Sequence, residues 1–188
     1  MRAVKWQRPL LDVEVPGSVV RRYAGRGQTF SEIHSDSGRI FSHRLWAELS
    51  GEPFDLPSPS REEVLRDYLD PIDVEDLVYA YLQAARDYIV LPTSRRRDTP
   101  AYEYALVHRT SGQPAVVQVK TGNTPVDVRL LARTAGKDHL AYAYSTTGSY
   151  RGRHDGVERI TDRELLRFVD SYPQLLPPRV KAWFDYAA

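Results

Sequence analysis

The sequence predicts an α/β fold with a mixed central sheet and helices on both of its faces. Three segments indicate it: an amphipathic helix over 71–86, two strands over 101–109 and 115–120 joined by a short turn, and a strand–helix–strand succession over 115–144. A tight turn joins antiparallel strands, whereas parallel strands need a crossover connection, usually a helix. Together these connections predict a sheet that contains both strand directions.

The helix over 71–86 begins with Asp70 as N-cap and Pro71 at the first helical position. Glu75 lies at the margin of the apolar face, where its carboxylate can reach into a partly dry site; a surface glutamate is the alternative. The apolar face that we expect to be buried consists of Val74, Leu77, Val78, Tyr81, Leu82 and Ala85.

The strand over 115–120 has two different faces. Ala115, Val117 and Val119 point one way, and Gln118 and Lys120 point the other way with Val116. Such a lysine is often only a solvated charge at the edge of a sheet, and this alternative stays open for the strand taken alone.

The preceding strand supplies an acidic partner. A hairpin centred on Ser111-Gly112 would place Glu103 opposite Lys120, and Ala105 opposite Gln118. Glu103, Gln118 and Lys120 would then share one face of the sheet.

The remaining segments complete the α/β pattern. Asn123, Thr124 and Pro125 indicate a helix start, a buried strand follows over 140–144, and Thr161 with Glu164 forms a capping box before another helix. A last short helix near the C-terminus should bury Val180, Trp183 and Phe184.

The proline-rich segment GEPFDLPSPS, residues 51–60, is the expected boundary between two parts of the chain. Residues 1–58 contain alternating valines such as Val13 and Val15 and several glycines, so we predict a small β-rich extension with a helix near 43–49. Residues 59–188 form the predicted main domain.

The composition narrows the class of protein. With 41% hydrophobic and 27% charged residues, the chain is typical of a soluble globular protein, and the absence of cysteine excludes disulfides and thiolate metal sites. No apolar run has the length of a membrane helix or of a signal peptide, so we expect a cytoplasmic protein. The five histidines have no metal-ligand spacing, and neither GxSxG nor GxxxxGK[ST] occurs.

The formal net charge is only +1, but arginines cluster in three places. Arg95, Arg96 and Arg97 precede the strand that bears Glu103, Arg151 and Arg153 flank a glycine, and a third group lies within 21–26. Such clusters suit nucleic-acid phosphates, although solvated loops have the same composition.

Residues 70–168 resemble the PD-(D/E)xK nuclease superfamily, and within it the Mrr-like restriction endonucleases, in which a QxK triplet replaces the usual acidic-x-Lys. The resemblance rests on the order of the Glu75 helix, Glu103, the triplet Gln118-Val119-Lys120, and the following helix, strand and helix. It implies a restriction-endonuclease-like fold and a Mg²⁺- or Mn²⁺-dependent DNA endonuclease of restriction or phage defence, which could act as a homodimer. Family members normally have aspartate at the position of Glu103.

The resemblance also implies a role for each residue of the site. Glu103 would bind the metal directly, Gln118 through its amide oxygen, Val119 through its carbonyl and Glu75 through water, while Lys120 would orient the attacking water or stabilise the developing charge. Gln118 in place of an acid removes one negative charge and so predicts weaker metal binding. Two alternatives remain: a nucleic-acid-binding module with a weakened site, and an interaction protein of a larger defence assembly.

Overall fold

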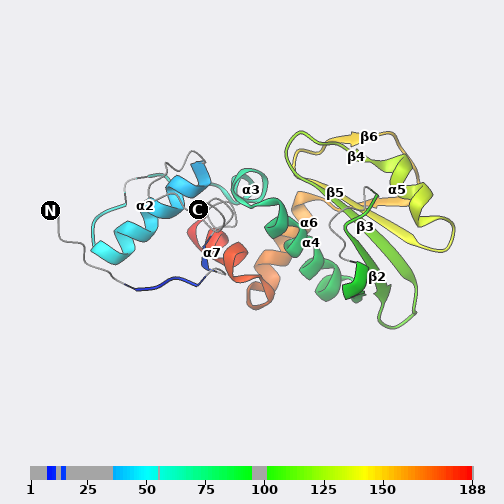
Figure 1. Ribbon diagram of the computed structural model, residues 1–188, viewed down its shortest axis with the longest axis horizontal. Coiled ribbons are helices and arrows are strands. Elements are labelled where there is room, and N and C mark those ends of the chain that lie inside the picture. Colours follow the sequence, from blue (N-terminus) through cyan, green and yellow to red (C-terminus); the bar gives the residue numbers. More distant parts are fainter. Residues whose placement is uncertain (1–7, 12–13, 16–35, 55, 95–100, 188) are drawn as a thin grey trace, which may run out of the picture.

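The computed structural model describes residues 8–11, 14–15, 36–54, 56–94 and 101–187. Its helices and strands follow one another along the chain with short connections (Figure 1). In chain order they are α2 (Asp36–Ser50), α3 (Arg61–Glu63), the π-helix η2 (Val64–Tyr68), α4 (Pro71–Ala85), β1 (Tyr88–Val90), the 3₁₀ turn η3 (Pro92–Ser94), β2 (Tyr104–His108), β3 (Pro114–Lys120), β4 (Val126–Asp127), α5 (Val128–Ala135), β5 (Leu140–Ser145), β6 (Tyr150–Arg151), β7 (Val157–Arg159), α6 (Asp162–Ser171), the 3₁₀ turn η4 (Pro173–Leu175) and α7 (Pro178–Tyr186).

The central sheet has five strands in the order β1-β2-β3-β5-β7. The pairs β1–β2 and β2–β3 are antiparallel, whereas β3–β5 and β5–β7 are parallel. The predicted mixed sheet is therefore confirmed, with β3 at the junction between its antiparallel and parallel halves.

Helices cover both faces of this sheet, as predicted. In Figure 1, α4 and α6 lie between the sheet and the part of the molecule that contains α2 and α7, and α5 lies on the other side of the sheet. The alternation of β3 explains the two layers, because Val117 and Val119 belong to the larger core with α4, α6 and α7, while Val116 belongs to the smaller core under α5.

Helix α4 forms where its periodicity predicts it, from Pro71 to Ala85, with Asp70 as N-cap. The predicted apolar face is buried from Val74 to Leu82, and only Ala85 in the last turn is exposed. The burial of Asp73 on the same helix was not predicted. None of the helices in the described ranges combines the length and the apolar character that crossing a membrane requires.

In the N-terminal extension, the predicted helix near 43–49 forms as part of the longer helix α2, whereas the described residues show none of the predicted strands. Among the described residues before 59, the ordered element is the 15-residue helix α2, and these residues contain no strand. Helix α2 forms because Ile40 and Phe41 pack on the larger core. The glycine-containing segment over 16–35, on which the β-rich prediction mainly depends, lies outside the described residues.

Helix α5 begins later than the sequence predicts. We expected its start at Asn123-Thr124-Pro125, but Asp127 is the N-cap, and its side chain accepts a hydrogen bond from the backbone N–H of Leu130. The delay has a physical cause, because Val126 and Asp127 form strand β4 and pair in parallel with β6. The chain therefore becomes helical only at Val128.

Candidate functional site

Strand β3 places Gln118 and Lys120 at the carboxyl end of the central sheet. Because side chains alternate, both point to the α5 side, next to Ala143 and Ser145 of β5 in the parallel register. Gln118 is only 2% exposed, so its amide lies inside the protein, whereas Lys120 is partly exposed. The end of β3 thus presents a buried amide and a reachable ammonium group.

Glu103 lies immediately before β2, at an irregularity of the sheet. Its backbone N–H donates to the carbonyl of Val117 at 2.8 Å, and Val117 is also the residue that Tyr104 faces in the ladder. Two consecutive residues therefore oppose one residue of β3, which is the arrangement of a β-bulge. Bulges redirect side chains, and here the result is that Glu103 reaches the end of β3.

The side chains of Lys120 and Glu103 are in direct contact. Lys120 Nζ donates to Glu103 Oε1 at 2.8 Å, with 27% and 22% of the two side chains exposed. The pairing register nevertheless differs from our prediction, because Ala105 lies opposite Val116 and not opposite Gln118.

The position of the turn explains why the observed β2–β3 register differs from the predicted one by two residues. His108 exchanges backbone hydrogen bonds with Gly112 and Gln113, so the loop is centred one residue earlier than Ser111-Gly112, and Gly112 adopts a φ of 70°. A glycine takes up this left-handed conformation without strain. A shift of two residues keeps each side chain on its face of the sheet, which is why the predicted contact still forms.

The carbonyl of Val119 faces the β2 side of β3. Carbonyl groups alternate along a strand, and Val117 is bonded on this side by Glu103 while the carbonyl of Lys120 is bonded on the other side by Thr146. The Val119 carbonyl therefore points beyond the last β2–β3 rung, toward the side from which Glu103 approaches.

Glu75 is connected to this region through Tyr104. The Tyr104 hydroxyl donates to Glu75 Oε2 at 3.4 Å, a long hydrogen bond, and the Tyr104 ring stacks on Tyr79 of the same helix. Tyr104 directly follows Glu103 in the chain. The structure thus joins Glu103 and Lys120 by contact and sets Gln118 and Val119 beside them on β3. Glu75 lies on the α4 side of the sheet, opposite the face to which Gln118 and Lys120 point, and contacts Tyr104 there.

Sequence reasoning missed Tyr104 and the loop after β5. The position of Tyr104 next to Glu103 is visible in the sequence, but its contact with Glu75 is not. Thr146 donates its backbone N–H to the Lys120 carbonyl and accepts from the Gly122 N–H with its side chain. No sequence signal indicates these contacts, because they depend on the pairing of β3 with β5.

The predicted arginines have different outcomes. Arg95, Arg96 and Arg97 lie outside the described residues. Arg151 on β6 donates to Asp127 Oδ2 at 2.6 Å, yet 72% of its side chain is exposed, and the Arg153 side chain is 89% exposed. The pKa of Asp127 lies below its usual value because the Leu130 N–H donates to the carboxylate and Arg151 pairs with it.

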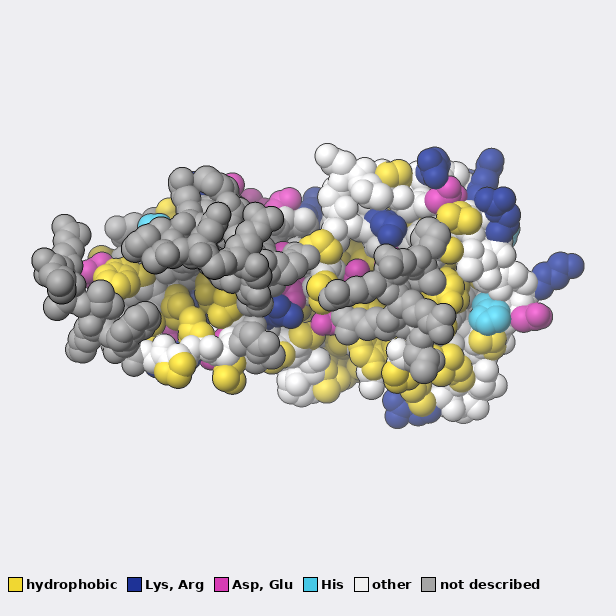
Figure 2. All heavy atoms as spheres, in the orientation of Figure 1, with side chains coloured by type: hydrophobic (Ala, Val, Ile, Leu, Met, Phe, Trp, Pro, Cys, Tyr) yellow, Lys and Arg dark blue, Asp and Glu magenta, His cyan; other side chains and the backbone are white. Residues whose placement is uncertain are grey.

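These two arginines belong to a larger cationic surface. Figure 2 shows Lys and Arg side chains gathered along the margin of the molecule near α5 and β6. Residues 127–155 contain five cationic side chains against three aspartates, and all five are exposed. We call them the α5–β6 arginine surface: Arg129, Arg133, Lys137, Arg151 and Arg153.

The donor atoms at the end of β3 suit a magnesium ion. Mg²⁺ prefers oxygen ligands, and Glu103 offers a carboxylate, Gln118 an amide oxygen and Val119 a carbonyl on the β2 side of the strand. Within the described ranges, no three His, Cys, Asp or Glu side chains are grouped so that they could hold a metal ion. The set is therefore poor in carboxylates but consistent with a weakly held magnesium ion.

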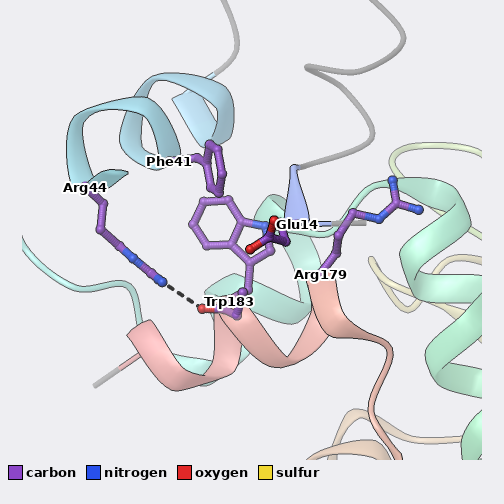
Figure 3. Close-up of a pocket in the computed structure, with 6 residues that line it drawn as sticks. Glu14, Phe41, Arg44, Arg179 and Trp183 are labelled. Atoms are coloured by element: carbon purple, nitrogen blue, oxygen red, sulfur yellow. Dashed lines mark hydrogen bonds between the residues drawn. The ribbon is translucent and has the colours of Figure 1, made fainter. Parts of the chain in front are cut away.

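Two pockets elsewhere are poorer candidates for chemistry. The pocket between α2 and α7, with Phe41, Arg44, Arg179 and Trp183 around it, has room for about one water molecule. Figure 3 shows Arg44 directed toward α7, where it donates a hydrogen bond to the carbonyl of Ala182 at 2.9 Å, so the pocket lies at a packing contact between α2 and α7. A broader pocket of about 580 Å³ lies at the opposite end of β3 from Lys120.

Comparison with known proteins gives no assignment: no family model matches the chain, and no curated protein or solved structure matches it significantly. The function must therefore be inferred from the side chains of the site and from the surface beside it.

Proposed function

We propose that this protein is a metal-dependent DNA endonuclease with a restriction-endonuclease-like domain, acting in restriction or phage defence in the cytoplasm. The observation that carries the proposal is the contact between Glu103 and Lys120 at the end of the central strand that also bears Gln118. The sequence of strand directions, two antiparallel pairings followed by two parallel ones, supports the same class.

In this proposal Glu103, the Gln118 amide oxygen and the Val119 carbonyl would hold Mg²⁺ or Mn²⁺, and Glu75 would contribute through water from the α4 side of the sheet. The metal, when bound, polarises a phosphate oxygen and lowers the pKa of a coordinated water. Lys120 donates a hydrogen bond to the attacking water or to the phosphate oxygen on which charge develops. Tyr104 orients the Glu75 carboxylate through its hydroxyl group.

A polyanionic substrate fits the surroundings of the site. The α5–β6 arginine surface lies on the face of the sheet to which Lys120 points, and strand β4 begins six residues after Lys120. Exposed arginines neutralise backbone phosphates and hold a duplex in register without reading its sequence. The main-domain residues thus offer both a reactive centre and a place for the flanking backbone.

Cleavage of supercoiled plasmid in Mg²⁺ or Mn²⁺ tests the proposal. Wild type should nick or linearise the plasmid, whereas Glu103→Ala and Lys120→Ala should each lose about a hundredfold to a thousandfold in rate, since each removes a preorganised charge. Lys181→Ala is the matched control, because Lys181 forms an ion pair of similar length with Asp185 on α7, remote from the site. Equal rates for wild type and Lys120→Ala would contradict the assignment, provided that both proteins melt at similar temperatures.

A second candidate is a nucleic-acid-binding module that does not cut. The observation in its favour is Gln118, since an amide at the position of an acid leaves Glu103 as the one carboxylate next to Lys120 in the described part of the site. This candidate predicts duplex binding without cleavage in any divalent metal. Absence of both binding and cleavage would favour the interaction-protein alternative.

A further inference from the structure

The ammonium group of Lys120 engages the carboxylate that the proposed function assigns to the metal ion. Nζ lies 2.8 Å from Oε1, so one of the two carboxylate oxygens is engaged by the lysine. A divalent cation bound to the same carboxylate would lie within a few ångströms of the positively charged Lys120 ammonium group. At such distances like charges repel strongly wherever water is partly excluded.

The backbone on both sides keeps this ion pair in place. Glu103 is fixed by its N–H bond to Val117, and the carbonyl of Lys120 is fixed by the N–H of Thr146 at 3.1 Å. About three quarters of each side chain is shielded from solvent, so water and salt screen the pair less than they screen a fully exposed one. The contact is therefore part of the ordered structure at the end of β3.

We propose that Lys120 is a resident counter-ion that lowers the affinity of Glu103 for metal, and that a substrate phosphate relieves this competition by giving Lys120 a new partner. The inference rests on the proposed function and concerns the regulation of the same site. It gives Lys120 a role in the protein without substrate, in addition to its role in the reaction.

The charges of the site support this coupling. The formal charges of Glu103 and Lys120 sum to zero, so the pair by itself does not attract a phosphate group. A bound divalent metal changes the sum to +2, which attracts it. Metal and phosphate should therefore strengthen each other's binding, and thermodynamic linkage requires the effect to be reciprocal. Lys120 increases this coupling because its ammonium group opposes the metal and favours the phosphate.

Calorimetric titration of the full chain with Mn²⁺ in the absence of nucleic acid tests the competition. Lys120→Met removes the charge but keeps most of the side-chain length, so it should bind Mn²⁺ at least about fivefold more tightly than wild type, as expected for loss of a partly exposed ion pair. Lys120→Arg keeps the charge and should stay close to wild type. Lys181→Met, which breaks the Lys181–Asp185 pair on α7, should leave Mn²⁺ affinity unchanged.

A second titration tests the relief by phosphate. Ca²⁺ is titrated in the absence and presence of a short DNA duplex, with Ca²⁺ chosen to limit cleavage during the measurement. The duplex should raise the Ca²⁺ affinity of wild type by a larger factor than that of Lys120→Met. An equal factor for both proteins overturns this part of the inference.

The outcomes separate the inference from the proposed function. Equal or weaker Mn²⁺ binding by Lys120→Met, with wild-type binding abolished by Glu103→Ala, overturns the inference and leaves the proposed metal site standing. Wild-type Mn²⁺ binding that Glu103→Ala leaves unchanged, or no binding by wild type and Lys120→Met, overturns both. Lys120→Gln repeats the test if Lys120→Met does not show a cooperative thermal unfolding transition.

Discussion

At the scale of single residues, Asp73 is the carboxylate most removed from water among the described residues. It lies in the first turn of α4, is 2% exposed, and pairs through Oδ1 with Arg179 of α7 at 3.2 Å. Its other oxygen, Oδ2, is buried without a hydrogen bond in the described structure. Burial raises the pKa of Asp73 to about 6, and the opposing charge of Arg179 offsets this only in part.

We predict that Asp73→Asn increases stability at neutral pH. The folded pKa of about 6 exceeds the unfolded value of 3.8, so the stabilising contribution of Asp73 is present below pH 3.8 and is lost as the pH rises through 6. This difference in pKa lowers the free energy of unfolding at neutral pH by about 3 kcal/mol relative to its value at acidic pH. Urea unfolding at pH 4 and pH 7 should show wild type and Asp73→Asn diverging with rising pH.

Asp185→Asn is the control for this prediction. Asp185 lies on α7 and pairs with Lys181, but its side chain is 56% exposed, so its replacement should have a small effect that varies little between the two pH values. A difference between wild type and Asp73→Asn that stays constant from pH 4 to pH 7 would contradict the burial argument.

Asp73 also shows which side-chain contacts cannot be predicted from the sequence: those between residues far apart in the chain. Helical periodicity identified the apolar face of α4 and the marginal position of Glu75, because both depend on spacing within one helix. The burial of Asp73 depends on Arg179, more than a hundred residues away in the chain. In the same way the sequence indicated that Lys120 meets an acid, but the bulge at Glu103 depends on the turn and was not predictable from alternation.

At the scale of elements, helix α6 shows how strongly local signals define a helix start. Thr161 and Glu164 form the predicted capping box: the Thr161 hydroxyl accepts from the Glu164 N–H, and the Glu164 carboxylate accepts from the Thr161 N–H. Glu164 also accepts from Arg86 and from the Tyr81 hydroxyl, so the start of α6 is tied to the end of α4.

We predict that Thr161→Ala lowers the free energy of unfolding by about 1 kcal/mol, the usual cost of an N-cap hydroxyl. Thr134→Ala is the matched control, since Thr134 lies inside α5 and its hydroxyl donates to the Leu130 carbonyl within the same helix. Alanine is the better helix former at such a position, so Thr134→Ala should be neutral or slightly stabilising. Chemical denaturation of wild type, Thr161→Ala and Thr134→Ala measures these free energies of unfolding. Equal decreases for the two variants would contradict the stabilising role of the Thr161 cap.

Elements defined by local patterns were predicted best. The starts of α4 and α6, and the burial of Val180, Trp183 and Phe184 in α7, follow from caps and periodicity. The two-residue strands β4 and β6 pair only with each other across an intervening helix and strand. So short a segment has no periodicity of its own, and its pairing in turn displaced the predicted start of α5.

At the scale of the whole molecule, charge is distributed unevenly although the formal sum is only +1. The α5–β6 arginine surface lies on one side of the sheet, while Arg163 and Arg167 are exposed on α6 on the other side. An extended polyanion bound at the Lys120 end of β3 should contact the former and not the latter.

Neutralising Arg151 and Arg153 together to glutamine should therefore weaken duplex binding and lower the slope of log affinity against log salt by up to about two, one for each phosphate contact. The pair Arg163→Gln with Arg167→Gln keeps the same net charge change on the opposite face and should leave the slope unchanged. Fluorescence anisotropy over a series of salt concentrations measures both. If the two double variants have equal salt slopes, the nucleic acid does not bind at Arg151 and Arg153. Arg95, Arg96 and Arg97 would then be the next candidates to neutralise.

The strand order of the sheet also bears on how the chain folds. Strands β1, β2 and β3 are neighbours both in the chain and in the sheet, and pairing of β2 with β3 closes a loop of only five residues, 109–113. Pairing of β3 with β5 must first close the 19 residues between Lys120 and Leu140, at a greater entropic cost. We therefore expect the antiparallel half to form before the parallel half, as contacts of short sequence separation generally do. Glu103 and Lys120 both belong to the antiparallel half, so their ion pair can form before β3 pairs with β5.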